Sequence, residues 1–471
     1  MEKLASKKES AWKTFRSEEH RAQMRSLADD YIGFISAAKT ERETVAEAIR
    51  RLEAAGFSQG FEGGRCYVQL HGKALFAARR GRRPLCEGVR LISAHTDSPR
   101  LDFKQHPLLE QVGVGQAKTH YYGGLRKYQW FARPLAVHGV IVKADGEALT
   151  VCLGEDDGEP VFTIADLLPH LAHNDAKKTL AEAFEAEKLN IILGHEPLLP
   201  EEDGAEDGGE EAKETAAKEE KEPVKSRILE LLHEKYGICE DDLISAELEA
   251  VPAGKARYVG LDRGIVGGYG QDDRICVYTA MQALLDAEDP EYTCCVIFWD
   301  KEEIGSDGST GASSRFFAYC IEDLAASWEP QTPFRRIMMN TKAISADVHA
   351  AVDPDWQDRH ELKNSAFFGH GVAFCKFTGS RGKYGANDAH PEYLGWMRGV
   401  LDARNIPWQM AELGKVDVGG GGTVALFLAA YGMDVVDAGP ALLGMHSPFE
   451  LSSLPDIYSA KLAYQAFFEA K

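Results

Sequence analysis

Histidines and carboxylates recur along this chain in short segments that together hold the side chains a paired-metal hydrolase needs. Imidazole nitrogens and carboxylate oxygens are the ligands that Zn²⁺ takes in catalytic sites. Two divalent ions that act together need such ligands from several separate segments, with a position left for water or substrate. The segments that offer this mixture are residues 94–99, 271–274, 299–305, 345–349, 418–423 and 445–448.

The first of these segments carries His95 and Asp97, two residues apart, directly after the apolar run 88–94. That run predicts a strand, and a ligand at a strand end is well placed for a site at the edge of a sheet. A carboxylate beside a metal-bound imidazole fixes the tautomer and orientation of the ring, a role open to Asp97. The alternative for the pair is an ordinary turn at the surface.

Two pairs of adjacent carboxylates follow later in the chain. Asp272 and Asp273 open a predicted helix after the glycine-rich stretch 264–270, where one carboxylate could bridge two metals. The alternative is a helix N-cap with a favourable dipole. Glu302 and Glu303 follow the apolar strand 294–299, so that one could bind metal while the other takes a proton from activated water. The alternative is a solvated charged pair.

Two single residues complete the pattern. Asp347 follows the apolar stretch 343–346, and His446 lies in a loop after the apolar run 435–443, which predicts a strand. Each could be an isolated turn residue. All of these positions at predicted strand ends of one region favour a shared metal site over separate structural roles.

A glycine run, 419–422, precedes Thr423 and an apolar helix. It is not a phosphate-binding P-loop, because the Lys-Ser/Thr ending is missing. Two interpretations stay open. The run could be a tight turn whose exposed amides, with Gly421 and Thr423, hold substrate backbone, or a plain turn that needs positive φ.

The surrounding pattern predicts an α/β protein. The N-terminal part is helical, with a capping box at 40–43, apolar positions from Val45 to Leu52 and a stop at Gly56. Alternating strands and helices with helices on both faces indicate a parallel α/β sheet. The expected strands are 66–70, 74–78, 88–94 and 292–299, and the expected later helices are 273–287, 308–325 and 388–404.

Residues 101–251 have a different character, with alternating apolar segments and frequent turn residues that predict a largely β insertion. An acidic run near 201–222 is almost free of apolar residues and is expected to be a solvated loop. The simplest organisation is a catalytic α/β domain in two parts, 1–100 and 252–471, interrupted by the insertion.

The composition of the chain limits the binding partners and the compartment that can be expected. The 471-residue chain carries a formal net charge of -21, which repels nucleic acid and anionic membranes at long range. Nine cysteines, an odd number without a Cys-x-x-Cys pair, fit a reducing compartment. Since no apolar run approaches the length of a membrane span, the protein is expected to be cytoplasmic.

Taken together, these segments resemble the M18 family of metalloaminopeptidases, which includes the aspartyl aminopeptidases. The resemblance extends over most of the chain and includes residues 122–124, 130–133 and 169–173 outside the metal segments. It implies a zinc-peptidase α/β/α sandwich interrupted by a β-rich dimerisation domain. It also implies a homodimer that assembles to a dodecamer, and peptide substrates with a free N-terminus.

The resemblance also implies roles for individual residues. His95, Asp272 and Asp347 would bind one Zn²⁺, and Asp272, Glu303 and His446 the other, with Co²⁺ or Mn²⁺ as possible substitutes. Glu302 would be the general base toward zinc-activated water, and Asp97 would orient His95. His170 would reach a neighbouring subunit's active site, with a packing role at the dimer interface as the alternative. Lys376 falls in the specificity region and could pair with an acidic substrate side chain, or be part of a solvated basic loop.

The expected reaction is removal of an acidic or neutral N-terminal residue from peptides. The sequence departs from the aspartyl aminopeptidase pattern in its enlarged insertion and at Gly419, which leaves substrate preference open and favours a bacterial branch. One rival is a related di-zinc carboxypeptidase or deacylase, which would cleave N-blocked substrates. Another is a catalytically silent oligomeric scaffold, which would be expected to lack a ligand or the base.

Overall fold

Two compact units make up the chain in its computed structural model, which describes residues 9–199 and 221–471. Unit 1 comprises Met1–Pro99 and Lys255–Lys471, and unit 2 is Arg100–Gly254. The acidic run predicted to be a loop near 201–222 lies almost wholly outside the described residues. Within the described ranges, none of the helices is both long enough and apolar enough to span a membrane.

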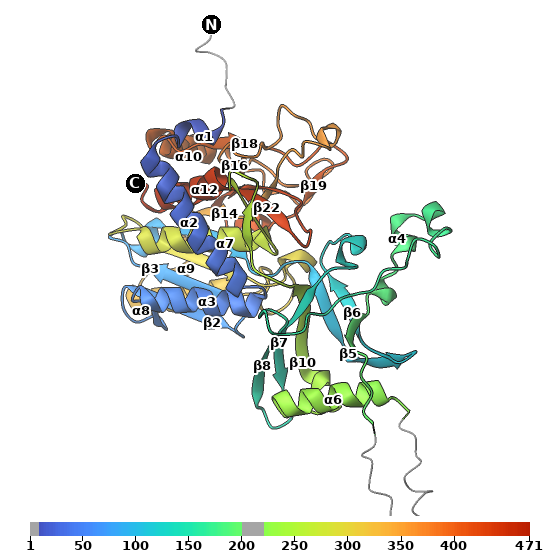
Figure 1. The fold of residues 1–471 in the computed structure, drawn as a ribbon. Helices are drawn as coiled ribbons and strands as arrows, with labels where there is room; N and C mark the ends of the chain where they lie inside the picture. Colours follow the sequence, from blue (N-terminus) through green and yellow to red (C-terminus); the bar gives the residue numbers. More distant parts are fainter. Residues whose placement is uncertain (1–8, 200–220) are drawn as a thin grey trace, which may run out of the picture. The chain divides into compact units, whose positions relative to one another are not determined.

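A nine-stranded sheet forms the centre of unit 1 (Figure 1). Its four central strands are parallel, as the sequence predicted, whereas the strand on each side of these four runs antiparallel to its central neighbour. The sheet is therefore mixed. In spatial order the strands are β1 (Ser58–Gln59), β2 (Arg65–Leu70), β3 (Ala74–Arg79), β13 (Cys294–Trp299), β4 (Arg90–His95), β14 (Lys342–Ser345), β20 (Asp434–Gly439), β16 (Val372–Cys375) and β18 (Trp408–Met410).

Helices cover both faces of this sheet, because its central strands are apolar on both sides. In β13, Val296 and Phe298 pack into one hydrophobic cluster, while Ile297 and Trp299 pack into another, as the two-residue period of a strand requires. The first cluster includes α2 (Glu18–Ala37), α3 (Glu41–Ala54), α7 (Gln271–Asp286), α10 (Pro391–Ala403) and α12 (Leu454–Phe468). The second includes α8 (Phe316–Trp328), α9 (Phe334–Asn340) and α11 (Ala425–Ala429).

The predicted helix start agrees with the structure where a local capping motif fixes it. The capping box of α3 is formed: the Thr40 hydroxyl accepts from Glu43 N, and Glu43 accepts from Thr40 N. The predicted helix over 308–325 was wrong in its first half, since α8 begins only at Phe316. The preceding residues form turns in which the Thr310 hydroxyl donates to the Asp300 carboxylate and the Ser313 hydroxyl donates to the carbonyl oxygen of Ser306.

The five-stranded sheet of unit 1 contains a second difference from the sequence prediction. The run 435–443, predicted as one strand, is divided between β20 and β21, because Pro440 has no N–H to continue the ladder. The chain passes there from the large sheet to the smaller one. The smaller sheet contains, in order, β11 (Arg257–Val259), β12 (Ile265–Gly268), β22 (Glu450–Ser453), β21 (Ala441–Leu443) and β15 (His349–Ala350).

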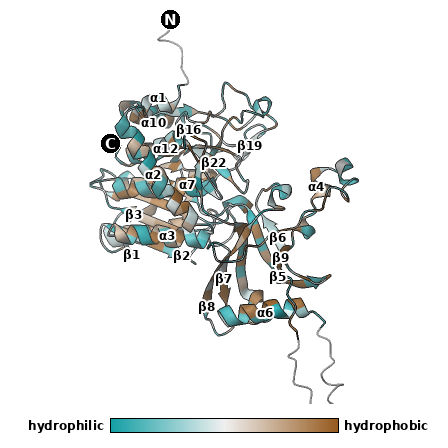
Figure 2. Cartoon of the chain, viewed as in Figure 1, coloured by the Kyte–Doolittle hydropathy of each residue, from teal (hydrophilic) through white to brown (hydrophobic). Residues whose placement is uncertain are grey.

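Unit 2 is built on a six-stranded antiparallel sheet. Its strands, in order, are β8 (Ala148–Leu153), β7 (Leu135–Val142), β10 (Ala246–Pro252), β5 (Arg100–Gln111), β6 (Val114–Tyr122) and β9 (Ile191–Gly194). Helix α6 (Pro223–Tyr236) contains both hydrophobic and hydrophilic residues (Figure 2) and buries Val224 and Ile228. Ile228 packs closely against Gly115 and Gly194 of the sheet.

Candidate metal centre

Three neighbouring parallel strands deliver candidate ligands to one edge of the large sheet. Strand β4 ends at His95, β13 runs directly into the segment with Glu302 and Glu303, and Asp347 follows β14 by two residues. The register pairs Trp299 with His95, so the ends of β13 and β4 are level. Because the carboxyl ends of parallel strands meet at one edge, residues distant in sequence converge there.

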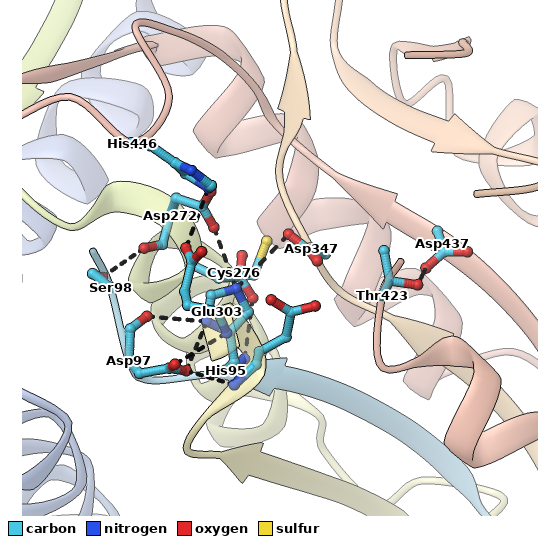
Figure 3. Close-up of polar contacts among 12 residues, drawn as sticks. His95, Asp97, Ser98, Asp272, Cys276, Glu303, Asp347, Thr423, Asp437 and His446 are labelled. Carbon is cyan, nitrogen blue, oxygen red and sulfur yellow. Dashed lines mark hydrogen bonds and ion pairs between the residues drawn. The ribbon is translucent and has the colours of Figure 1, made fainter. Parts of the chain in front are cut away.

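Asp272 lies between two histidines (Figure 3). It stands at the start of α7, and His446 comes from the loop between β21 and β22. Asp272 Oδ1 is 3.3 Å from His95 Nε2, and Asp272 Oδ2 is 3.1 Å from His446 Nε2. Each carboxylate oxygen of Asp272 therefore faces a different imidazole.

Glu303 lies beside His446, and Asp347 lies beside His95. Glu303 Oε1 lies 3.3 Å from His446 Nε2, and Asp347 Oδ1 lies 4.0 Å from His95 Nε2. Ligand atoms of His95, Asp272 and Glu303 all lie within 4.8 Å of one another, as do those of His95, Asp273 and Asp347. The structure thus brings together all five residues predicted as metal ligands.

The donor set fits a divalent cation. Asp272 Oδ1 and Glu303 Oε1 are buried, and each faces an imidazole Nε2 at 3.3 Å without a hydrogen bond of regular geometry among the described residues. A buried carboxylate without a compensating donor or cation is costly. Imidazole and carboxylate ligands in this mixture are those that zinc binds.

Electrostatics within the group reflect its crowded negative charge. Burial raises the pKa of the carboxyl groups of Glu303 and Asp347 well above the ordinary value, and the charge of Asp272 adds to this effect. Burial alone would raise the pKa of Asp272 as well. Interactions with the imidazoles of His446 and His95 outweigh burial, so the pKa of Asp272 is lowered. For His446, burial acts downward, but the hydrogen bond to Asp272 prevails and raises the pKa to about 10.

Asp97 contacts both the histidine and the glutamate pair. Its Oδ1 atom lies 3.2 Å from His95 Nδ1, and its backbone oxygen lies 3.0 Å from the same nitrogen. Asp97 also accepts backbone hydrogen bonds from Glu302 N and Glu303 N, each at 3.1 Å. The contact to Nδ1 leaves Nε2 of His95 facing Asp272 and Asp347.

A cavity of about 310 Å³ opens on the centre. Glu302 lines it, and burial raises the pKa of this carboxyl to about 6. Gly421 and Thr423 line it too, although Thr423 and Asp437 stand apart from the ligand group in Figure 3. Among the described residues the cationic side chains in its lining are Arg381, Lys383 and Lys415, and Lys376 is not in the lining.

The glycine run and Lys376 have defined partners. Gly420–Gly421 form a short strand, β19, paired with β17 (Gly379–Ser380), so the run is not simply a turn. Gly420 has φ +119°, and a Cβ there would lie 2.1 Å from Gly379 O, which explains the need for glycine. Lys376 Nζ pairs with Asp388, which also pairs with Lys383.

Two residues next to the ligands were not assigned a role from the sequence. Asp273 Oδ2 accepts a hydrogen bond from His95 N at 3.2 Å, and its position beside Asp272 was the available signal. Glu450 accepts hydrogen bonds from His446 N and Asp272 N, and burial raises its pKa to about 8. No sequence pattern pointed to Glu450. His170 lies exposed in a turn of unit 2.

Comparison with known proteins decides the family. Residues 34–468 match the family model described as aminopeptidase I zinc metalloprotease (M18). This chain belongs to the M18 family. The M18 chain is therefore a zinc metalloaminopeptidase, and curated relatives with high sequence identity carry the same family name. It is 47% identical to the probable M18 family aminopeptidase 1 of Clostridium acetobutylicum, with 94% of each chain covered. It is 46% identical to the protein of that name from Thermotoga maritima, covering 95% of this chain and 96% of the relative.

Solved structures agree with the fold of this M18 member. The crystal structure of an M18 family aminopeptidase from Thermotoga maritima matches with a TM-score of 0.90 at 44% identity, covering 99% of this chain and 100% of that one. The aminopeptidase I structure from Borrelia burgdorferi matches with a TM-score of 0.79 at 34% identity, covering 98% and 100%. The M18 α/β fold predicted from the sequence is thereby confirmed.

Proposed function

We propose that this M18 member is a cocatalytic di-zinc aminopeptidase that removes the N-terminal residue from peptides. The observation that carries this proposal is the position of Asp272, whose two carboxylate oxygens face His95 and His446 separately. A single ion would not require the carboxylate to serve two imidazoles. His95, Asp272 and Asp347 would hold one zinc ion, and Asp272, Glu303 and His446 the other, with Co²⁺ or Mn²⁺ as substitutes.

Asp273 has a supporting role in this assignment. Its ligand atom lies within reach of His95 and Asp347, but its Oδ2 already accepts the backbone N–H of His95. Asp273 therefore fixes the backbone of His95. Asp272 is the better shared ligand, because its two carboxylate oxygens face His95 and His446 separately.

Glu302 is the proposed general base. When bound, the zinc pair would polarise the scissile carbonyl and make water acidic near neutral pH. Glu302 lines the cavity, and its pKa of about 6 leaves it ionised at neutral pH yet able to accept a proton. It would take the proton from the attacking water and pass it to the leaving amine. Asp97 would hold Glu302 by its backbone N–H and His95 by Nδ1.

Carboxylates around the centre also suit an aminopeptidase, because they can receive the free α-ammonium group of the substrate. The side chain of the N-terminal residue would enter the cavity beside Gly421 and Thr423. Arg381, Lys383 and Lys415 in the lining are compatible with an acidic residue, and the apolar part of the lining with a neutral one. Asp388 pairs with both Lys376 and Lys383. Lys376 would contribute to substrate preference indirectly, by neutralising part of the charge of Asp388 beside Lys383.

Assembly is the second part of the proposal. Unit 2 would be the dimerisation domain, and dimers would assemble to a dodecamer in the cytoplasm, without nucleic acid or membrane as partners. A solved structure of the mApe1 dodecamer from yeast shares the fold at 19% identity and a TM-score of 0.72. In such an assembly His170 would reach the active site of a neighbouring subunit. Mass measurement of the zinc-loaded protein tests the assembly, and a dimer as the largest species would contradict it.

Hydrolysis of aminoacyl p-nitroanilides tests the reaction. The panel contains Asp, Glu and Leu derivatives and an N-acetylated control, assayed before and after chelation and after zinc or cobalt is restored. Metal-dependent cleavage confined to free amino termini is expected. Cleavage of the blocked control would instead indicate a carboxypeptidase or deacylase, and absence of any cleavage by zinc-loaded protein would indicate a silent scaffold.

A further inference from the structure

Glu450 joins the backbones of two proposed ligands of the same zinc ion. Its side chain is buried, with 1% exposed, at the first position of β22. Glu450 Oε1 accepts a hydrogen bond from His446 N at 2.7 Å, and Oε2 accepts one from Asp272 N at 3.1 Å. One carboxylate thus connects the start of α7 to the loop that carries His446.

The backbone of Glu450 is itself held firmly. Glu450 pairs with Gly268 in the β12–β22 ladder, and its carbonyl oxygen accepts a hydrogen bond from Gln271 Nε2 at 2.6 Å. The other end of that amide, Gln271 Oε1, accepts the hydroxyls of Tyr31 and Ser452. All these residues are buried, so the carboxylate projects from a rigid base toward two loops.

We infer that Glu450 is a positioning residue that sets the separation of Asp272 and His446 and thereby the affinity for the zinc ion they share with Glu303. The inference rests on the proposed di-zinc function. Glu450 touches neither substrate nor metal in this arrangement, since its oxygens are directed at backbone N–H groups. Its influence passes through the placement of the two ligands.

A carboxyl group is required because both partners are N–H donors and each of its two oxygens can accept one of them. Glutamine has nearly the same shape but offers one acceptor oxygen and one NH₂ group. In Glu450→Gln, one of the two buried N–H groups would face the amide NH₂ and lose its acceptor. The loop of His446 or the start of α7 would then shift to recover a partner, because an unpaired buried donor is costly.

Asp456 provides a matched control within unit 1. It is fully buried near the start of α12 and accepts two backbone N–H bonds, from Gly369 N and Gly371 N, each at 2.7 Å. It contacts none of the proposed ligands. Asp456→Asn therefore removes an equivalent acceptor from the core without altering the metal centre.

The experiment measures zinc in the full chain after dialysis against buffered free zinc, together with a competition titration against a fluorescent chelator. Wild type is expected to hold two ions per chain. Glu450→Gln is expected to retain one ion and to bind the second about 10–100-fold more weakly. Asp456→Asn is expected to bind both as wild type does. The rise in Tm on adding zinc should shrink for Glu450→Gln and remain for Asp456→Asn.

The outcomes separate the two proposals. Two ions bound by Glu450→Gln with wild-type affinity would overturn the positioning role and leave the di-zinc function intact. A wild type that never binds a second ion would overturn the di-zinc proposal itself. If circular dichroism shows that Glu450→Gln is unfolded, Glu450→Asp replaces it. This variant keeps both acceptors but shortens their reach by one methylene, so undiminished second-site affinity there would also refute the role.

Discussion

Asp97 and Glu302 are joined through the main chain: Asp97 Oδ1 accepts the backbone N–H of Glu302 at 3.1 Å. The same oxygen lies 3.2 Å from His95 Nδ1, and Oδ2 of Asp97 accepts Glu303 N. One carboxylate therefore couples a proposed ligand on β4 to the proposed base after β13. The relative placement of base and metal depends on a residue that touches neither the substrate nor the proposed ions.

Asp97→Asn should lower kcat/KM by about 10–100-fold, because an amide can accept on one side only and fixes the wrong tautomer of His95. The measurement is hydrolysis of a p-nitroanilide at saturating zinc. Asp358→Asn, at an exposed aspartate, serves as the control. Unchanged kcat/KM in Asp97→Asn would remove Asp97 from the mechanism.

Glu302→Gln should lower kcat by about 10²–10⁴-fold, the usual contribution of a general base. Because Glu302 is not a proposed ligand, the zinc content should stay at the wild-type level. Glu303→Gln is the matched comparison, since it should lose zinc as well as activity. Zinc content is measured by mass spectrometry of the metal. Loss of zinc from Glu302→Gln would show that the roles of the two glutamates had been exchanged.

Removing metal should abolish activity and destabilise unit 1, because buried carboxylates would be left without a counter-ion. Ligand linkage gives about 2.7 kcal/mol of stabilisation at zinc one hundred times its dissociation constant. Tm measured before chelation, after chelation and after zinc is restored checks this. A Tm that does not respond to zinc would contradict the assigned ligand set.

Asp456 should make stability depend on pH. Burial raises its pKa to about 8 in the folded protein, against about 4 in an unfolded chain. Between these values the folded state holds a proton that the unfolded state releases, so this contribution to stability falls as pH rises from about 4 to about 8. The free energy of unfolding in urea should show a weaker decline over this window in Asp456→Asn. Equal pH dependence in the two proteins would disprove the assignment.

Substrate preference should respond more to Lys383 than to Lys376. Lys383 lines the cavity, whereas Lys376 acts through its pairing with Asp388. Lys383→Ala should reduce the ratio of Asp to Leu p-nitroanilide hydrolysis by several-fold, and Lys376→Ala by less. An unchanged ratio in both variants would exclude a charge-based preference at this part of the cavity.

Each proposed ligand could be picked out from the sequence because it stands next to a recognisable local pattern. Apolar runs mark β4, β13 and β14. His95 ends β4, Glu302 and Glu303 follow β13 after Asp300 and Lys301, and Asp347 lies two residues beyond β14. Parallel pairing brings such residues to one edge without further information. The capping box of α3 was equally readable, since its two hydrogen bonds involve residues three apart.

What escaped prediction depends on contacts between distant segments. Glu450 acquires its role only because β22 pairs with β12 and so faces the start of α7. The division of 435–443 depends on which sheet each half joins, and the late start of α8 on hydrogen bonds such as that from Thr310 to Asp300. Local propensity carries none of this information.

The order of the proposed ligands along the chain bears on the timing of activity during synthesis. His95 is synthesised early, whereas His446 is synthesised after nearly all of unit 1. Asp272 contacts both histidines, so the proposed centre is complete only when His446 is present. A ribosome-bound chain that has not passed His446 therefore lacks a complete centre, although its β4 and β13 are already present. With the proposed ligand set, an unfinished chain would be unable to cleave peptides, and activity would begin only when the last strands of unit 1 are complete.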